Sequence, residues 1–273
     1  MTSDRWELLA CPLDLASPLN GAGDTLVCPT CGTRYPVEDG IPRMLPLAGA
    51  RDEAEASQTE RERTQRDREA QTYDANRTLA ALSVAEVPLT LGWLKPGATD
   101  VVVEVGCGTG RMTRRLSGRC GQVWALDHSV DSLRVAREKV GASGVRFVQA
   151  DAGYLPLRPE VADGALSCQM LEHLPTGALR ERAVAEAARV LKPGCRFVVS
   201  AYWHSPLTRL RGDQQGHHSG MIYYYRFSRP EFRALLGRAF EVEAITRRLV
   251  YILLASCRKR ESPDTHGTRL ATA

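Results

Sequence analysis

The spacing of apolar and polar positions changes along the chain and divides it into predicted elements. From about residue 100 onward, short apolar runs alternate with segments whose apolar residues recur at helical spacing. That alternation is typical of a doubly wound α/β sheet. Seven segments are predicted as strands, at residues 100–105, 122–127, 145–150, 163–169, 195–202, 240–246 and 250–257.

Helices are predicted between these strands. Residues 129–140 and 177–191 each place their apolar side chains along one stripe, as the core-facing side of a helix requires. Another helix is expected to begin after Ser228, because Ser228 and Glu231 have the spacing of a capping box, and to run to about Ala239.

The part of the chain before Tyr73 has a different pattern. Residues 1–48 are rich in Cys, Pro and Gly, with short apolar pieces between turn signals, which predicts a small β-rich module. Residues 49–72 alternate charge sign and have no apolar stripe, which predicts a solvated, partly helical linker. An α/β domain at 73–257 and a disordered tail at 258–273 complete the expected organisation.

Length and composition agree with a globular protein. The chain has 273 residues, 43% of them hydrophobic, which suffices for one large domain and a small one. No run approaches the roughly 18 apolar residues of a membrane span, and the N-terminus lacks a signal-peptide pattern. Four of the eight cysteines are scattered singly, unlike a secreted disulfide framework: Cys107, Cys120, Cys168 and Cys257. We therefore expect a cytoplasmic protein without membrane association.

The net charge of +4 is unevenly distributed. Residues 1–48 carry three arginines, no lysine and six acids, and residues 51–72 carry five arginines and seven acids. The chain from Tyr73 onward therefore carries a net charge of +9. Any attraction for an anionic partner is expected in this larger part.

The stretch VVVEVGCGTGR, residues 101–111, ends a predicted strand in a glycine loop. Its glycines stand at positions 106, 108 and 110, and Arg111 occupies the position where a dinucleotide-binding fingerprint has its third glycine. The Gly-Lys-Ser/Thr ending of a phosphate P-loop is absent too. Glu104 would repel a pyrophosphate and attract a cation. The loop is predicted to hold a ligand with an ammonium and a sulfonium rather than a phosphate.

EVGCGTG closely resembles the first motif of the class I S-adenosylmethionine (SAM)-dependent methyltransferases, in particular the UbiE-like, type 11 group. SCQMLEHL is similar to the SxxVLEHL of that family, and RVLKPGCRF resembles its helix, turn and fifth strand. The resemblance covers roughly residues 70–257. It implies a Rossmann-like seven-stranded α/β fold with an antiparallel seventh strand, and SAM as the cofactor.

The resemblance also implies roles for individual residues. Asp127 would accept hydrogen bonds from the ribose, Asp151 and the Ala152 N–H would meet the adenine, and Cys168 would lie beside the methionine part. Tyr73 resembles a residue that closes over SAM. The full expected cofactor set is Tyr73, Glu104, Gly106, Cys107, Gly108, Gly110, Asp127, His128, Asp151, Ala152, Cys168 and Gln169. The plainer alternative is that the glycines only form a tight turn and the aspartates only cap helices or turns.

Methyl transfer from a sulfonium is an in-line displacement that requires positioning and, for some nucleophiles, a general base. The insertion at residues 202–227 contains the catalytic candidates His204, His217 and His218. Taken singly, each is expected to be a surface or structural residue rather than a catalytic one, but as a group they mark where to look for a base. The IYYYRF segment in this insertion can equally be a plain β-ribbon. The resemblance assigns Glu172 and His173 to packing rather than to catalysis.

The N-terminal module contains C-x2-D followed by C-x2-C, at Cys11, Asp14, Cys28 and Cys31. Residues 6–45 resemble the zinc-ribbon activator proteins of tRNA and translation-factor methyltransferases. A structural zinc ion is expected, with Asp14 in place of the usual thiolate. The alternatives are a vestigial mini-domain without metal and a docking module for a protein partner.

The acceptor class stays open between two kinds of substrate. A small-molecule or natural-product acceptor is favoured, because the module is acidic and has no lysine, whereas an RNA grip should be basic. A ribosomal or transfer RNA base methyltransferase that docks its substrate through the module is the alternative, supported by the positive charge after Tyr73. A non-catalytic SAM-fold scaffold is the third hypothesis.

Overall fold

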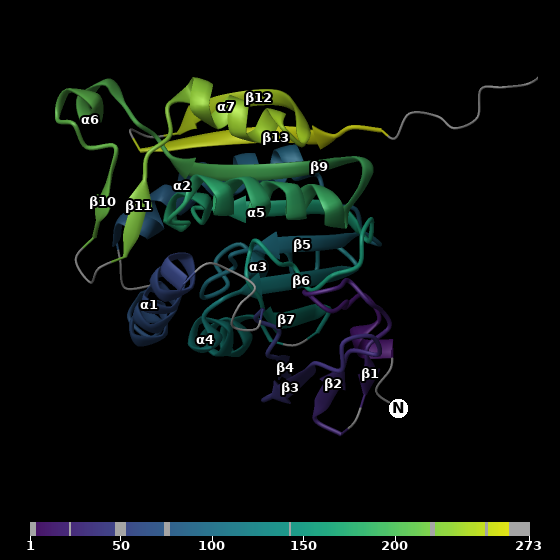
Figure 1. Cartoon of the computed structure of the whole chain (residues 1–273). Coiled ribbons are helices and arrows are strands. Elements are labelled where there is room, and N and C mark those ends of the chain that lie inside the picture. The colour runs from purple at the N-terminus through teal and green to yellow at the C-terminus, as the bar shows by residue number, and fades with distance from the viewer. Residues whose placement is uncertain are drawn as a thin grey trace, which may run out of the picture.

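The centre of the molecule is a seven-stranded sheet in the order β12-β13-β9-β8-β5-β6-β7 (Figure 1). The computed structural model describes residues 4–21, 23–46, 53–73, 77–141, 143–218, 222–248 and 251–261. The strands are Val101–Val105 (β5), Gln122–Asp127 (β6), Val145–Gln149 (β7), Ala162–Cys168 (β8), Leu191–Tyr202 (β9), Phe240–Arg248 (β12) and Ile252–Lys259 (β13). β13 runs antiparallel to β12 and β9, and the ladders from β9 to β7 are parallel. The expected Rossmann-like fold class is confirmed.

Helices cover both faces of this sheet. One face carries Arg77–Leu94 (α2), Thr113–Leu116 (α3) and Val130–Val140 (α4), and the other carries Gly177–Val190 (α5) and Arg229–Gly237 (α7). The capping box at Ser228 is present, with both reciprocal hydrogen bonds. Sequence patterning missed α2, because this helix is apolar on most sides and contains Pro88, which normally argues against a helix interior.

The N-terminal module packs against the β7 edge of the sheet. After the turn Asp4–Trp6 (η1) it forms a four-stranded sheet, with strands Asn20–Gly21 (β1), Thr25–Val27 (β2), Arg34–Glu38 (β3) and Ile41–Pro42 (β4). Arg43 forms a parallel bridge with Gln149 at the end of β7, and Leu9 an antiparallel bridge with Leu157. Buried Leu9 and Met44 belong to the same apolar cluster as Trp124 in β6. Module and domain therefore share one core.

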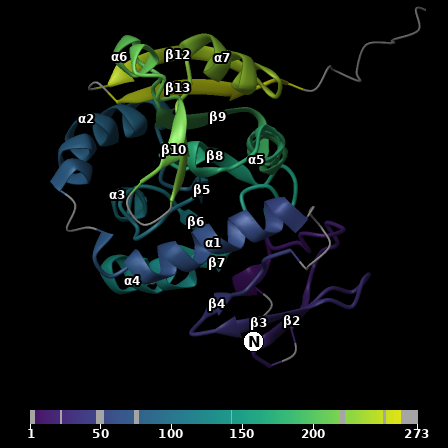
Figure 2. The same cartoon turned by 60° about the vertical axis from the view of Figure 1, so that its left-hand side comes forward.

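The segment expected as a solvated linker is a helix, Glu53–Glu69 (α1), that lies across the carboxyl ends of the central strands (Figures 1 and 2). The expectation of a solvated helix was wrong. Glu62 is 6% exposed and accepts the Tyr223 N–H at 3.1 Å, and Asp67 accepts the Ser129 hydroxyl at 2.6 Å. The helix is held by its carboxylates rather than by an apolar stripe. Their donors lie far away in sequence, so the pattern of α1 could not reveal the contact.

The insertion after β9 contains Pro206–Leu210 (α6) and a two-stranded ribbon of Gln215–His217 (β10) and Tyr223–Tyr225 (β11). Between β8 and α5 lies a single turn, Leu171–His173 (η3). β13 extends to Lys259, so the start of the expected tail was wrong, and residues 262–273 lie outside the described part of the chain. Among the described helices, none has the length and apolar character of a membrane span.

Candidate functional site

Two adjoining cavities lie at the carboxyl ends of β5, β6, β7 and β8, beneath α1. Their volumes are about 80 Å³ and about 50 Å³. Both are lined by Gly106, Asp127, His128, Met170 and His173. Chain order along the sheet reverses between β5 and β8, and open α/β sheets bind their ligands at such a switch point.

Asp127 ends β6 and fixes the glycine loop. Its Oδ2 accepts the Gly108 N–H at 2.8 Å, and its Oδ1 accepts the Ser129 N–H at 2.9 Å. The side chain is 8% exposed and lines both cavities. An ionised carboxylate has about four acceptor positions, so two remain for ligand hydroxyls. The turn role and the binding role of Asp127 are therefore compatible.

The glycine loop needs glycine most at position 106. Gly106 has φ +77°, and a Cβ there would lie 2.4 Å from Cγ of Met170, so β5 approaches the loop after β8 closely. Gly110 has a different neighbourhood: a Cβ there would lie 3.0 Å from Ala136 on α4, and Gly110 lines a separate groove instead of the two cavities. The structure thus places Gly106, Cys107 and Gly108 in the first cavity but not Gly110.

A buried carboxyl group and two guanidinium groups line the first cavity. Glu104 is 2% exposed and accepts the Thr113 hydroxyl at 2.7 Å, and burial raises the pKa of its carboxyl to about 8. Arg66 on α1 and Arg111 after the glycine loop face the same space. The cavity therefore offers an acid to a cationic group and guanidinium groups to a carboxylate, as a zwitterionic ligand requires.

The second cavity combines apolar walls with three acidic residues, Glu62, Asp127 and Asp151. Val105, Leu126 and Leu155 provide apolar contacts, while Asp151 and Ala152 lie at the end of β7. Asp151 is 3% exposed, and its Oδ1 accepts the Gly153 N–H at 2.8 Å. An apolar slot with a carboxylate at its rim suits an aromatic base with an amino group.

A buried polar network supports the cavity from below. Glu86 of α2 is fully buried and accepts hydrogen bonds from Gln169 Nε2 at 2.7 Å and from the Ser200 hydroxyl, and it forms an ion pair with Arg111 at 2.8 Å. Gln169 has φ +57°, an uncommon conformation for a residue other than glycine, at the end of β8. Glu86 therefore holds Gln169 and Arg111 in position. Cys168 and Tyr73 line the first cavity beside this network.

His173 lies in both cavities, although the resemblance assigned it to packing. Its Nδ1 is 2.7 Å from the Tyr223 carbonyl oxygen, which can only accept a hydrogen bond, so Nδ1 carries the proton and Nε2 has a free lone pair. Burial, and then the charge of Arg66, lower the pKa of His173 well below its usual value. The imidazole is therefore neutral and able to accept a proton.

The three histidines named as catalytic candidates lie around this site rather than in it. His217 is exposed and packs against Tyr223, and His204 Nε2 is buried without a hydrogen-bond partner in the described part of the chain. The His218 ring lies 6.3 Å from the ring of His173. None of the three lines either cavity.

The expected metal ligands come together in the N-terminal module. The ligand atoms of Cys11, Asp14, Cys28 and Cys31 all lie within 4.8 Å of one another. Tetrahedral zinc separates two sulfurs by about 3.8 Å and a sulfur from an oxygen by about 3.6 Å. The Cys11–Cys31 sulfurs are 3.7 Å apart, and the Asp14 oxygens lie 3.3 and 3.5 Å from Cys28 Sγ. The four residues fit a zinc ion.

Comparison with known protein families matches two parts of the chain. Residues 103–199 match the methyltransferase domain family, and residues 6–40 match the family described as Trm112p-like protein. Residues 103–199 are a methyltransferase domain. The first match runs from within β5 to within β9, and it therefore includes the glycine loop, Asp127, Asp151 and His173.

Relatives of this methyltransferase domain differ in their substrates. The chain is 36% identical over 112 residues to an O-methyltransferase of Penicillium expansum, 33% over 164 residues to a demethylmenaquinone methyltransferase of Desulfitobacterium hafniense, and 35% over 104 residues to a tRNA (carboxymethyluridine(34)-5-O)-methyltransferase of Arabidopsis thaliana. These matches cover 39%, 54% and 38% of this chain, and 40%, 60% and 24% of the relatives. The chain thus spans less than two thirds of their length.

Solved structures share the fold of the methyltransferase domain. A SAM-dependent methyltransferase of Methanosarcina mazei matches with a TM-score of 0.57 at 18% identity, covering 64% of this chain and 98% of that chain. A complex between the Haloferax volcanii Trm112 methyltransferase activator and a methyltransferase matches with a TM-score of 0.55 at 18% identity, covering 65% and 89%. The fold is that of SAM-dependent methyltransferases.

The residues that line the two cavities fit SAM. Glu104 and Asp127 suit the cationic groups and the ribose, Arg66 suits the carboxylate, and the apolar slot suits the adenine. His128 Nε2, which is buried without a partner among the described residues, adds one more polar atom at the junction of the cavities. Sequence reasoning missed Arg66 and Glu86, because neither position stands out from the charges and apolar residues around it.

Proposed function

We propose that the chain is a SAM-dependent methyltransferase that methylates a small-molecule acceptor by in-line displacement. The observation that carries this proposal is the junction of the two cavities at Gly106 and Asp127, where an acidic, a cationic and an apolar subsite meet. SAM bound there would supply a methyl group on a sulfonium leaving group. The three subsites correspond to its three chemical parts.

Residues of α1 close this site. Each cavity is smaller than the roughly 300 Å³ of a usual small-molecule pocket. Glu62 and Arg66 of α1 form part of the cavity walls, so cofactor binding requires α1 to move outward. The same helix then excludes water from the bound donor, as transfer to an acceptor other than water requires.

His173 is the general base in this proposal. Its Nδ1–H is held by the Tyr223 carbonyl, which leaves Nε2 to accept a proton from the acceptor. A base with a lowered pKa suffices, because a hydroxyl or amine becomes strongly acidic as its methyl bond forms. His218 and Tyr202 pack edge-on against the His173 ring and hold its orientation.

Titration calorimetry with SAM and with its demethylated product tests the cofactor site first. We expect micromolar binding by the natural sequence and its loss in Asp127→Ala, with Asp24→Ala in the module as the control. Failure of the intact protein to bind either compound would overturn the enzyme proposal and favour the scaffold hypothesis. His173→Gln should retain SAM binding and lose turnover once an acceptor is found.

RNA is the second candidate acceptor, favoured by the Trm112p-like match and the tRNA-methylating relative. Binding to structured RNA with a steep salt dependence would support it.

The Trm112p-like module is proposed to hold a structural zinc ion and to carry any contact with a protein partner. Cobalt or zinc titration of the purified protein, with release by a chelator, tests the metal site.

A further inference from the structure

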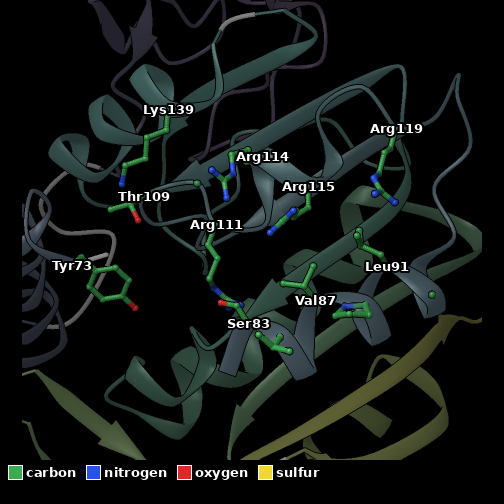
Figure 3. Close-up of a pocket in the computed structure, with 14 residues that line it drawn as sticks. Tyr73, Ser83, Val87, Leu91, Thr109, Arg111, Arg114, Arg115, Arg119 and Lys139 are labelled. Atoms are coloured by element: carbon green, nitrogen blue, oxygen red, sulfur yellow. The ribbon is translucent and has the colours of Figure 1, made fainter. Parts of the chain in front are cut away.

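A groove of about 960 Å³ lies beside the two cavities of the proposed SAM site, which is called the donor site below, and runs between α2 and α3 (Figure 3). It is separate from the two cavities, but it shares Tyr73, Thr109 and Arg111 with the first of them. Tyr73 and Arg119 lie at opposite ends of the view in Figure 3. The groove therefore begins at the wall of the first cavity, called the donor cavity below, and extends along the helical face of the domain.

One wall of the groove is apolar. It consists of successive turns of α2, with Val84, Val87, Pro88 and Leu91 lining the space. Val84 is 78% exposed, so its side chain is accessible to a ligand in the groove. This wall suits an apolar chain or ring.

The opposite wall is cationic. Arg114, Arg115 and Arg119 of α3 and the following turn line it, with Arg111 and Lys139 beside them. Glu86 compensates Arg111, but within the described residues Arg114, Arg115 and Arg119 form no ion pair. The lining contains no acidic residue. Three like charges on adjacent turns repel one another, and a bound anion would remove that repulsion.

We propose that this groove binds the acceptor, and that the acceptor is an amphipathic anion with a phosphate group on the arginines and an apolar portion along α2. The assignment rests on the proposed function, because the shared wall at Tyr73 and Arg111 is what connects the groove to the donor cavity. The volume lies within the range of small-molecule sites. A single-stranded nucleic acid would instead require several stacking aromatic side chains, and Tyr73 is the one aromatic residue among those that line the groove.

Decyl phosphate, used below its micelle concentration, is the probe. Calorimetry should show saturable binding to the natural protein, with decyltrimethylammonium and inorganic phosphate each binding at least tenfold more weakly. Arg114→Glu/Arg115→Glu should weaken decyl phosphate binding at least tenfold, and Val84→Asp should do so through the other wall. These side chains are exposed, so the fold should tolerate the changes.

The matched control is Arg209→Glu/Arg211→Glu, which makes the same charge change at exposed positions in and after α6. It should alter decyl phosphate binding less than twofold. All variants should bind the demethylated cofactor normally. Because the two sites share a wall, a saturating amount of the demethylated cofactor should tighten the binding of decyl phosphate. Decyl phosphate should tighten the binding of the demethylated cofactor by the same factor.

Four results would overturn all or part of the inference. Equal binding of the phosphate and ammonium probes would show that charge is not recognised. Unchanged binding in both groove variants would place the probe elsewhere. Loss of RNA binding in Arg114→Glu/Arg115→Glu, without decyl phosphate binding by the natural protein, would make this face an RNA contact. If the protein bound decyl phosphate but no cofactor, the groove would still be a binding site for an amphipathic anion, but its role in methyl transfer would be refuted.

Discussion

Replacing Glu86 tests whether the buried network beneath the donor site holds Gln169 and Arg111 in place. Glu86→Ala removes a fully buried carboxylate that accepts hydrogen bonds from Gln169 and Ser200 and pairs with Arg111 at 2.8 Å. Removing one partner of a buried ion pair costs about 3–5 kcal/mol. The Arg111 side chain is 23% exposed and can turn toward the groove, so the lower end, about 3 kcal/mol, is expected.

Two further variants separate charge from packing. Glu86→Gln keeps the size of the side chain and one acceptor oxygen, so its cost should fall to about 1–2 kcal/mol. Glu181→Ala removes the carboxylate that pairs with Arg238 at 2.6 Å, but that carboxylate is 43% exposed and should contribute less than about 1 kcal/mol. Urea unfolding gives the three free energies, and calorimetry gives the affinity for SAM.

We expect Glu86→Ala to weaken SAM binding as well, because Gln169 and Arg111 both line the cofactor cavity. An unfolding free energy of Glu86→Ala within about 1 kcal/mol of the natural protein would refute the reasoning, since Glu86 would then behave like an exposed charge. Normal stability of Glu181→Ala is needed for the comparison to hold.

Three shorter predictions concern the cofactor and metal sites. Burial raises the pKa of Glu104 to about 8, so the protonated carboxyl group stabilises the free protein less and less as pH rises from about 4.5 through about 8. A cationic ligand should lower this pKa, and SAM binding at pH 7 should therefore release up to about one proton. Calorimetry in two buffers should detect that proton, and it should be absent in Glu104→Gln. Gly106→Ala, with a Cβ 2.4 Å from Met170, should abolish SAM binding, whereas Gly23→Ala, with open space around it, should not; normal binding by the first would contradict the close approach. Asp14→Cys should tighten zinc binding and Asp14→Ala weaken it in chelator competition, and equal affinities would exclude Asp14 as a ligand.

The elements that the sequence predicts well carry their own signal. Most strands of the central sheet have a local apolar run, and Ser228 together with Glu231 specifies where a helix starts. Glu104 and Asp127 could be placed because strand ends and glycine spacing fix their positions in the fold. The boundaries were less certain: β9 begins at Leu191, four residues before the expected start.

The features that the sequence does not predict depend on partners that are distant in the chain. The position of α1 rests on Glu62 and its contact with Tyr223, 161 residues away. His173 becomes a candidate base only because the Tyr223 carbonyl, 50 residues away, fixes its tautomer. No periodicity in either segment encodes such a pairing. In both cases the missing information is tertiary.

The N-terminal module reaches the donor site through a short chain of contacts. The Arg43 guanidinium donates to the Gln149 side chain, and Gln149 Nε2 donates to the His128 carbonyl at 2.8 Å, one residue beyond Asp127. The Met44 N–H also bonds the Gln149 carbonyl at 2.9 Å. Because buried Cys11, Cys28 and Met44 share one core cluster, loosening the metal cluster should loosen this edge. Zinc removal should therefore weaken SAM binding as well as the module itself, and an unchanged SAM affinity in the metal-free protein would show that the contacts at Gln149 hold without the metal.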